Sequence, residues 1–166
     1  EDKNHWSLVD NGVYPAVNGC VPTSGDNVFF TSNSGFIVGA NTVSIMTYAT
    51  CNDMTWINAP NNPILTGSTD VPFFISGSVI LHNNLSYRVI DTYFNSASDQ
   101  TLQSNSVQID RSNLNYYKVG SGDLLLVDDF NNGDRASFFL LKGGFFTQGK
   151  NVSFNQFRSE STTVRT

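Results

Sequence analysis

The sequence predicts an all-β protein whose short strands stack as a β-solenoid, and three observations point to it. Aromatic residues make up 13% of the chain and Phe alone occurs 13 times, whereas Glu occurs only at Glu1 and Glu160. β-branched and aromatic side chains suit pleated surfaces, and Glu is a good helix former. Short apolar runs recur at fairly even spacing, with turn residues between them, and no segment keeps a helical period.

The apolar runs are the expected strands, because runs of this length that alternate or are bounded by turns are typical of strands. In chain order, they cover residues 28–30, 36–38, 43–46, 54–57, 73–75, 79–81, 87–90, 107–109, 124–127, 138–141, 145–146 and 152–157. Gly, Asn, Asp and Ser between them favour tight turns. The expected turns cover residues 24–26, 32–35, 61–62, 76–78, 83–84, 120–122, 131–133 and 143–144. The polar stretch 96–106 is predicted to be a loop.

Two architectures use many short strands: a solenoid like a parallel β-helix, and a two-sheet β-sandwich. The segments 120–129 and 136–154 read as successive strands at roughly coil-length spacing, each ending in a turn of small residues. A single coil cannot bury its apolar face, so coils need neighbours above and below. The solenoid is therefore the predicted fold, and the sandwich stays as the alternative.

Length and charge restrict the function classes. A chain of 166 residues fits one all-β domain over 1–166, and a start at Glu1 without Met suggests a processed or excised piece. A net charge of −5 argues against nucleic-acid binding, which needs a basic surface. No window approaches the ~20 apolar residues of a membrane helix, so membrane insertion is not expected.

The two cysteines, Cys20 and Cys51, lie 31 positions apart and are expected to form a disulfide. Free thiols are the alternative, and a metal pair is disfavoured because His5 and His82 are far away in sequence. A composition rich in Asn, Ser and Thr looks secreted, and oxidising compartments allow disulfides. A closed loop of this length would stabilise the fold by about 3–4 kcal/mol.

Acidic residues are the first candidates for chemistry. A glycosidase needs two carboxylates across the scissile bond, and Asp128 with Asp129 is the best local pair, with Asp110, Asp123 and Asp134 as neighbours. We interpret these acids as structural turn residues, because a turn follows directly. A lyase would need a basic residue near a bound uronate, and the candidates are isolated: Arg88, Arg111 and Arg135.

Three weaker readings remain. A Ser–His–Asp site has only His5 and His82 available, and His82 is predicted to be a strand-end or turn residue. No cofactor is predicted, but calcium is considered, with turn oxygens as ligands: Asp26, Asp53, Asp128, Asp129 and Asp134. Exposed tyrosines could stack on sugars; of Tyr116 and Tyr117 only one can face outward. The other candidates are Tyr14, Tyr87 and Tyr93.

Several blocks of the sequence also resemble a known protein family. The resemblance is carried by five blocks: 5–7 (His-Trp-Ser), 20–30 (CVPTSGDNVFF), 42–45 (TVSI), 49–56 (ATCNDMTW) and 62–68 (NPILTGS). Segments 79–81 and 142–154 look like later coils, and 91–118 matches poorly. The chain resembles the N-terminal solenoid-type domains of large Bacteroidota surface proteins exported by the type IX secretion system, including gliding-motility adhesins of the SprB kind.

The resemblance implies a non-enzymatic adhesin module outside the cell, acting in gliding motility or attachment. It also implies that the chain is a fragment of a much larger multi-module surface protein. The partners that it implies are surface polysaccharide, other cell-surface proteins and the type IX machinery. The first alternative is a carbohydrate-active β-helix enzyme, a lyase or hydrolase, or its carbohydrate-binding accessory module. The second is a structural spacer without a ligand.

Overall fold

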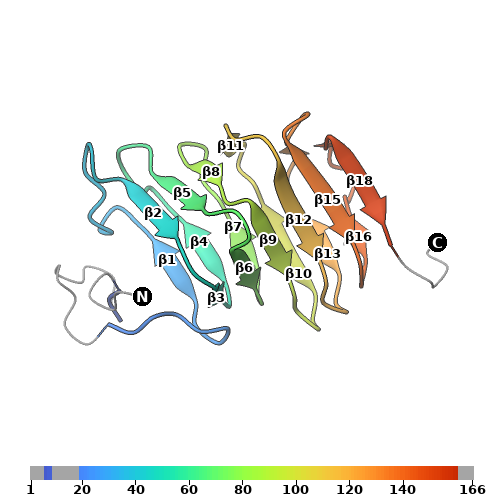
Figure 1. Cartoon of the computed structure of the whole chain (residues 1–166), viewed down its shortest axis with the longest axis horizontal. Helices are drawn as coiled ribbons and strands as arrows, with labels where there is room; N and C mark the ends of the chain where they lie inside the picture. Colours follow the sequence, from blue (N-terminus) through green and yellow to red (C-terminus); the bar gives the residue numbers. More distant parts are fainter. Residues whose placement is uncertain (1–5, 9–18, 161–166) are drawn as a thin grey trace.

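The computed structural model describes residues 6–8 and 19–160, and these form a β-solenoid without a helix (Figure 1). Strands from successive coils lie side by side on three faces, and all the strand pairs are parallel. Parallel neighbours need a crossover, and here the crossover is one circuit of the coil. The predicted solenoid is confirmed, and the sandwich alternative is excluded.

Each coil contributes one strand to each face. Face 1 contains β1 (Val28–Phe30), β4 (Met54–Trp56), β7 (Val79–Ile80), β10 (Gln100–Gln103), β13 (Leu124–Leu126) and β16 (Phe145–Phe146). Face 2 contains β2 (Thr42–Ile45), β5 (Ile64–Gly67), β8 (Ser86–Arg88), β11 (Gln108–Ile109), β14 (Phe130–Asn131) and β17 (Val152–Ser153). Face 3 contains β3 (Ala49–Cys51), β6 (Pro72–Ile75), β9 (Asp91–Phe94), β12 (Leu114–Lys118), β15 (Ala136–Leu140) and β18 (Gln156–Ser159). We number the coils 1 to 6, from β1–β3 to β16–β18.

Alternation within each strand builds the core. In β12 and β15, every second side chain is buried, as expected where one side of a pleated strand faces inward. The register places equivalent inward positions over one another, as for Tyr116, Phe138 and Phe157 on face 3. The core is therefore a set of side-chain stacks along the solenoid axis.

Face 2 is interrupted between coils 4 and 5. Strands β11 and β14 are not paired, so this face divides into a four-stranded and a two-stranded sheet. The Arg135 Nη1 atom donates to the Ile109 carbonyl at 3.0 Å, which bridges the interruption with a side chain.

Glycines allow the tight corner between faces 3 and 1. A Cβ at Gly77 would lie 2.1 Å from Asp53 Oδ1, and one at Gly120 would lie 1.9 Å from the Ser96 carbonyl oxygen. Larger residues would push the coils apart at these positions. The turns expected at 76–78 and 120–122 are thus confirmed.

The loop prediction for 96–106 is wrong, because β10 occupies Gln100–Gln103. Gln100, one of the polar residues that suggested a loop, points inward. The Gln100 Nε2 atom donates to the carbonyls of Ile75 at 3.0 Å and Gly77 at 2.6 Å. A buried polar side chain with its hydrogen bonds made is compatible with a strand.

The structure contains no bond between Cys20 and Cys51, which were predicted to form a disulfide, and both thiols are free. Cys51 is the last residue of β3 and points into the core with 2% of its surface exposed, whereas Cys20 is exposed. Burial, with a smaller contribution from Asp53, raises the pKa of the Cys51 thiol to about 12. Cys51 therefore acts as a small apolar core residue.

The two ends of the solenoid differ. At coil 1, Trp6 packs on Phe30, which in turn stacks on the buried Trp56 with ring centroids 3.9 Å apart. Trp6 therefore caps the end of the solenoid, and Trp56 belongs to the core. At coil 6, the inward positions Phe157 and Val152 are 50% and 37% exposed, because none of the described residues covers them.

Candidate functional site

The acids singled out as a catalytic pair bind backbone amides of neighbouring coils. Asp128 accepts hydrogen bonds from the amides of Ser104 and Asn105 at 2.7 and 2.5 Å. Asp129 accepts from the amide and side chain of Asn151 at 2.9 and 3.0 Å, and these bonds hold the pKa of its carboxyl below its usual value. The interpretation of both as structural turn acids fits this geometry.

A second series of side chains links the coils at the corner before face 1. The first acceptors are Asn27, whose Oδ1 takes the Asp53 amide at 3.2 Å, and Asp53, whose Oδ1 takes the Ser78 amide at 2.6 Å. Further along, Asp99 accepts from the Asp123 amide at 3.0 Å, and Asp123 accepts from the Gly144 amide at 2.7 Å. We call Asp53, Asp99, Asp123, Asp128 and Asp129 the coil-linking acids.

The proposed calcium ligands do not converge. Asp53 lies on a different turn from the adjacent Asp128 and Asp129, all three have the amide partners given above, and Asp26 accepts the Thr23 hydroxyl at 2.6 Å and amide at 2.8 Å. Those Thr23 hydrogen bonds lower the pKa of the Asp26 carboxyl. Within residues 6–8 and 19–160, no three His, Cys, Asp or Glu side chains are grouped as a metal site.

The arginines weighed for a lyase site are not isolated. Arg88 forms an ion pair with Asp110 in the next coil at 2.5 Å, and Arg135 reaches Ile109 as described above. Arg111 Nη1 donates to the carbonyls of Gly67 at 3.1 Å and Arg88 at 3.4 Å. All three arginines link coils.

Histidine offers no catalytic triad in the part of the chain that the structure describes. His82 follows β7, and its Nδ1 atom lies 2.5 Å from Asn84 Oδ1, as a turn residue would. The interpretation of His82 is confirmed, and His5 lies outside the described residues.

A notch interrupts the corner between faces 2 and 3, and turn length creates it. Four residues join β5 to β6 (68–71) and β11 to β12 (110–113), but only two join β8 to β9 (89–90). The turn of coil 3 is thus recessed between two longer turns. The resulting cavity has a volume of about 510 Å³ and is lined by Thr69, Asp70, Ile90, Asp91, Arg111, Ser112, Asn113, Asn115 and Tyr117.

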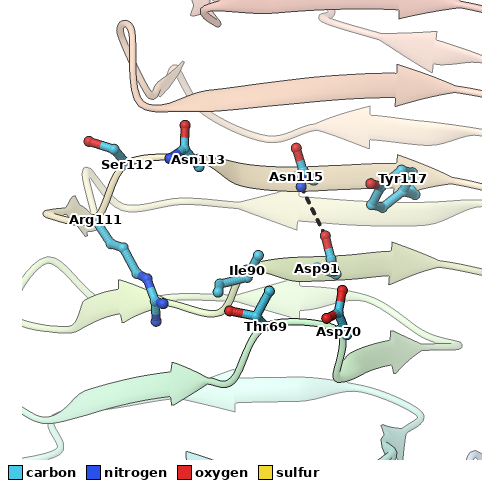
Figure 2. A pocket seen from close by; sticks show the side chains of 9 residues that line it. All are labelled: Thr69, Asp70, Ile90, Asp91, Arg111, Ser112, Asn113, Asn115 and Tyr117. Carbon is cyan, nitrogen blue, oxygen red and sulfur yellow. Dashed lines mark hydrogen bonds between the residues drawn. The ribbon is translucent and has the colours of Figure 1, made fainter.

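Figure 2 shows how the lining divides the notch. Thr69 and Asp70 form one wall, and Ser112 and Asn113 form the other, with Ile90 and Asp91 on the floor between them. Asp70 and Asn113 both have positive φ angles, of 62° and 64°, which Asp and Asn tolerate better than most residues.

The charged groups occupy opposite ends of the notch. Arg111 closes one end, whereas Asp70 and Asp91 lie at the other, next to Asn115 and Tyr117 (Figure 2). Asn115 Nδ2 donates to Asp91 Oδ1 at 2.9 Å, and the Asn115 amide donates to the Ile90 carbonyl at 2.6 Å. These bonds fix the floor against coil 4 and leave the second Asp91 oxygen without a hydrogen bond among the described residues.

Beyond Tyr117, the notch opens onto a row of aromatic rings along the outside of face 3. Their neighbouring centroids are 4.5–5.2 Å apart: Tyr48, Phe74, Tyr93, Tyr117 and Phe139. We call this row the aromatic ladder. Stacked pairs of this kind contribute about 0.5–1.5 kcal/mol each beyond their burial.

The tyrosines that were considered for stacking on sugars lie in different environments. Tyr117 faces outward and Tyr116 inward, as the alternation requires, and Tyr87 is buried while Tyr93 is in the ladder. Tyr14 lies outside the described residues. Because Tyr93 stacks between Phe74 and Tyr117, its ring faces are occupied, so the ladder offers ring edges and hydroxyl groups to a ligand.

Burial and Asp91 act together on the ladder hydroxyls. Burial, followed by the charges of Asp91 and Tyr93, raises the pKa of Tyr117 to about 12. Burial and then Asp91 raise the pKa of Tyr93 as well. Both phenols are therefore neutral hydrogen-bond donors at neutral pH.

The sequence did not single out Asp70 or Asp91, and Arg111 was weighed only for a lyase site. The feature of the sequence that could have indicated the notch is the difference in turn length between neighbouring coils. It can be read only when the strand boundaries are known to within one residue.

Comparisons of the chain with protein-family models, curated proteins and solved structures found no match. Among the described residues, no helix has the length and apolar character needed to cross a membrane.

Proposed function

We propose that this chain is a non-enzymatic surface module that binds polysaccharide through the notch and the adjoining outer surface of face 3. One observation carries the proposal: a recess of about 510 Å³ with hydroxyl, amide and charged groups is lined by Tyr117, which also belongs to the aromatic ladder. Sugars present hydroxyl groups and apolar C–H faces, so such a mixed lining suits them.

The interactions that the other polar groups make within the fold favour binding over catalysis as the function. The coil-linking acids are engaged with backbone amides, and Arg88 and Arg135 are engaged between coils. A carboxylate held in this way is a hydrogen-bond acceptor of the fold, with little freedom to move a proton to or from a ligand.

The cellular role that we propose is that of a secreted adhesin. Export by the type IX system, an outer-surface location and a part in gliding or attachment rest on the resemblance carried by the five blocks 5–7, 20–30, 42–45, 49–56 and 62–68. In an adhesin, many modules that each bind weakly give strong attachment together, because the second contact is intramolecular. Other cell-surface proteins are further proposed partners.

A second candidate function is hydrolysis or lyase cleavage of the same polysaccharide. The observation that favours it is that Asp70 and Asp91 line one recess together with Arg111. Two carboxylates about 5–10 Å apart are the minimum for glycoside hydrolysis. A spacer that binds no ligand is the third outcome.

One experiment separates the three. The chain is applied to an array of polysaccharides, and the bound samples are then analysed for new reducing ends and for unsaturated uronates. Retention without new ends supports adhesion, and release of either product supports the enzyme. No retention on any glycan would overturn the proposed function and favour the spacer.

A further inference from the structure

We propose that the notch recognises an amino sugar, with the protonated amine of the sugar held between Asp70 and Asp91. This inference rests on the proposed function, since it names the class of glycan that the same site takes. It is argued below from the shape of the notch, its charge and its hydrogen-bonding groups.

The shape suits one or two sugar rings. The walls project because the turns at 68–71 and 110–113 are longer than the turn at 89–90 between them. The volume of about 510 Å³ falls within the range of about 300–1,000 Å³ usual for ligand sites. Ile90 is half-buried on the floor, where the apolar face of a sugar ring can lie on it.

The charge balance favours a cation. The notch contains two carboxylates and one guanidinium group, and that guanidinium is tied by Nη1 to the Gly67 and Arg88 carbonyls. Neither Asp70 nor Asp91 has a basic partner among the described residues, unlike Asp110, which pairs with Arg88. The whole chain carries a net charge of −5, which adds to the attraction for a cation.

The electrostatic effect of Asp91 reaches the neighbouring ladder. After burial, its charge is a cause of the raised pKa of both Tyr93 and Tyr117. An ammonium group placed beside Asp91 would experience the same field with the opposite sign, and would be stabilised by it.

The remaining lining groups match the hydroxyl groups of a sugar. Thr69 and Ser112 offer hydroxyls from opposite walls, and Asn113 offers an amide. Tyr117 adds a neutral phenol at the carboxylate end. An acidic sugar would bring its carboxylate into a recess that already has a surplus of negative charge, so it fits this lining less well.

The test uses two ligands that share one sugar backbone and differ at the amine, where acetylation removes the charge and adds an acetyl group. A β-1,4-linked glucosamine oligosaccharide and its fully N-acetylated counterpart are titrated into the full chain by calorimetry at a pH of about 5.5, where amines are protonated and carboxylates ionised. The expected result is at least tenfold tighter binding of the charged oligosaccharide, weakening as salt is added.

Two isosteric variants test whether the carboxylates of Asp70 and Asp91 bind the amine of the sugar. Asp70→Asn and Asp91→Asn each remove one negative charge, and Asn also tolerates the positive φ of Asp70. Each is expected to weaken binding of the charged oligosaccharide by about tenfold, with little change for the acetylated one. Asp134→Asn is the matched control, because Asp134 is an exposed acid on the corresponding turn of coil 5, outside the notch.

The failures are distinguishable. Equal binding of the two oligosaccharides, or unchanged binding in both notch variants, would overturn the amino-sugar inference and leave the proposed function standing. A loss equal to that in Asp134→Asn would reduce the effect to overall charge and would also overturn it. If the array shows no glycan binding at all, both proposals fall together.

Discussion

Two sets of aspartates lie on this solenoid, and they differ in what they bind. The coil-linking acids accept backbone amides from the neighbouring coil, as Asp123 does from Gly144 and Asp128 from Ser104. Asp70 and Asp91 line a recess, and among the residues that the structure describes the only hydrogen bond to either carboxylate comes from Asn115 to Asp91. Residue type is the same in both sets, so the hydrogen-bond partners separate a structural role from a binding role.

This difference shows that composition alone cannot tell whether an acidic residue of a solenoid has a structural or a ligand-binding role. A turn acid that satisfies an amide in the next coil replaces a water molecule and ties two coils together. Asp70 lies on a turn that projects past a shorter neighbour, so it has no such amide opposite it, and Asp91 lies on the floor between the two longer turns. Variants that change one set should therefore alter stability, and variants that change the other should alter binding.

The largest effect is expected for Asp128→Ala. This change removes the acceptor of two amides, those of Ser104 and Asn105, and should lower the free energy of unfolding by about 1–3 kcal/mol. Chemical denaturation measures the change, and Asp128→Asn is the control because it keeps one acceptor oxygen. Equal stability of wild type and Asp128→Ala would contradict the structural role.

A similar effect of opposite sign is expected for Lys118→Met, at the corner between faces 3 and 1 that Asp99 and Asp123 occupy. The Lys118 side chain is fully buried, and Nζ donates to the Gly120 carbonyl at 2.7 Å. Burial lowers its pKa to about 8, although Asp123 and Asp99 oppose this. An apolar replacement should raise stability at neutral pH by about 1–3 kcal/mol.

The pH dependence of that variant checks the cause. The unfolded chain holds the Lys118 proton up to about pH 10.4, whereas the folded chain releases it near 8. Wild-type stability should therefore rise relative to Lys118→Met as pH increases from about 8 to 10. A constant difference across this range would show that the buried charge is not the cause.

A smaller effect on stability is expected when the pH is lowered. Hydrogen bonds from Asn151 hold the folded-state pKa of Asp129 below its unfolded value, so their stabilisation is present above that value and is lost as pH falls through the folded pKa. Thermal melts of wild type and Asp129→Asn between pH 5 and about 2.5 should converge at the acid end. Parallel curves throughout would count against this contribution.

The smallest effect on stability is expected in the notch. Asp70→Asn changes an exposed side chain that keeps its shape and its backbone conformation, so the free energy of unfolding should stay within about 0.5 kcal/mol of wild type. Differential scanning calorimetry is the measurement. A clear loss of stability would place Asp70 among the structural acids.

The sequence predicted the parts of the fold that depend on local chemistry. Glycine turns such as 120–122 and the opposite orientations of Tyr116 and Tyr117 follow from rules within one strand or turn. The strand β10 was missed because the partners of Gln100, the Ile75 and Gly77 carbonyls, lie in the preceding coil. Cys20 and Cys51 suggested a bridge, but the alternation of β3 directs Cys51 into the core.

The candidate site depended still more on register. Asp70, Asp91 and Arg111 come from three successive coils, and their proximity follows from pairings such as Pro72 with Asp91 and Asp91 with Asn115. A shift of one residue in any strand would change which side chains meet. Sequence spacing alone cannot supply that register when coil lengths vary.

The most direct measurement compares Asp123→Ala with the double variant Asp70→Asn/Asp91→Asn, recording the melting temperature and the retention on immobilised glycan for each. Because Asp123 accepts the Gly144 amide, the first variant should melt at a lower temperature yet bind like wild type when it is folded. The double variant should melt like wild type and lose retention. A notch variant that unfolds early, or a folded Asp123→Ala protein that no longer binds, would contradict the separation of the two sets of acids.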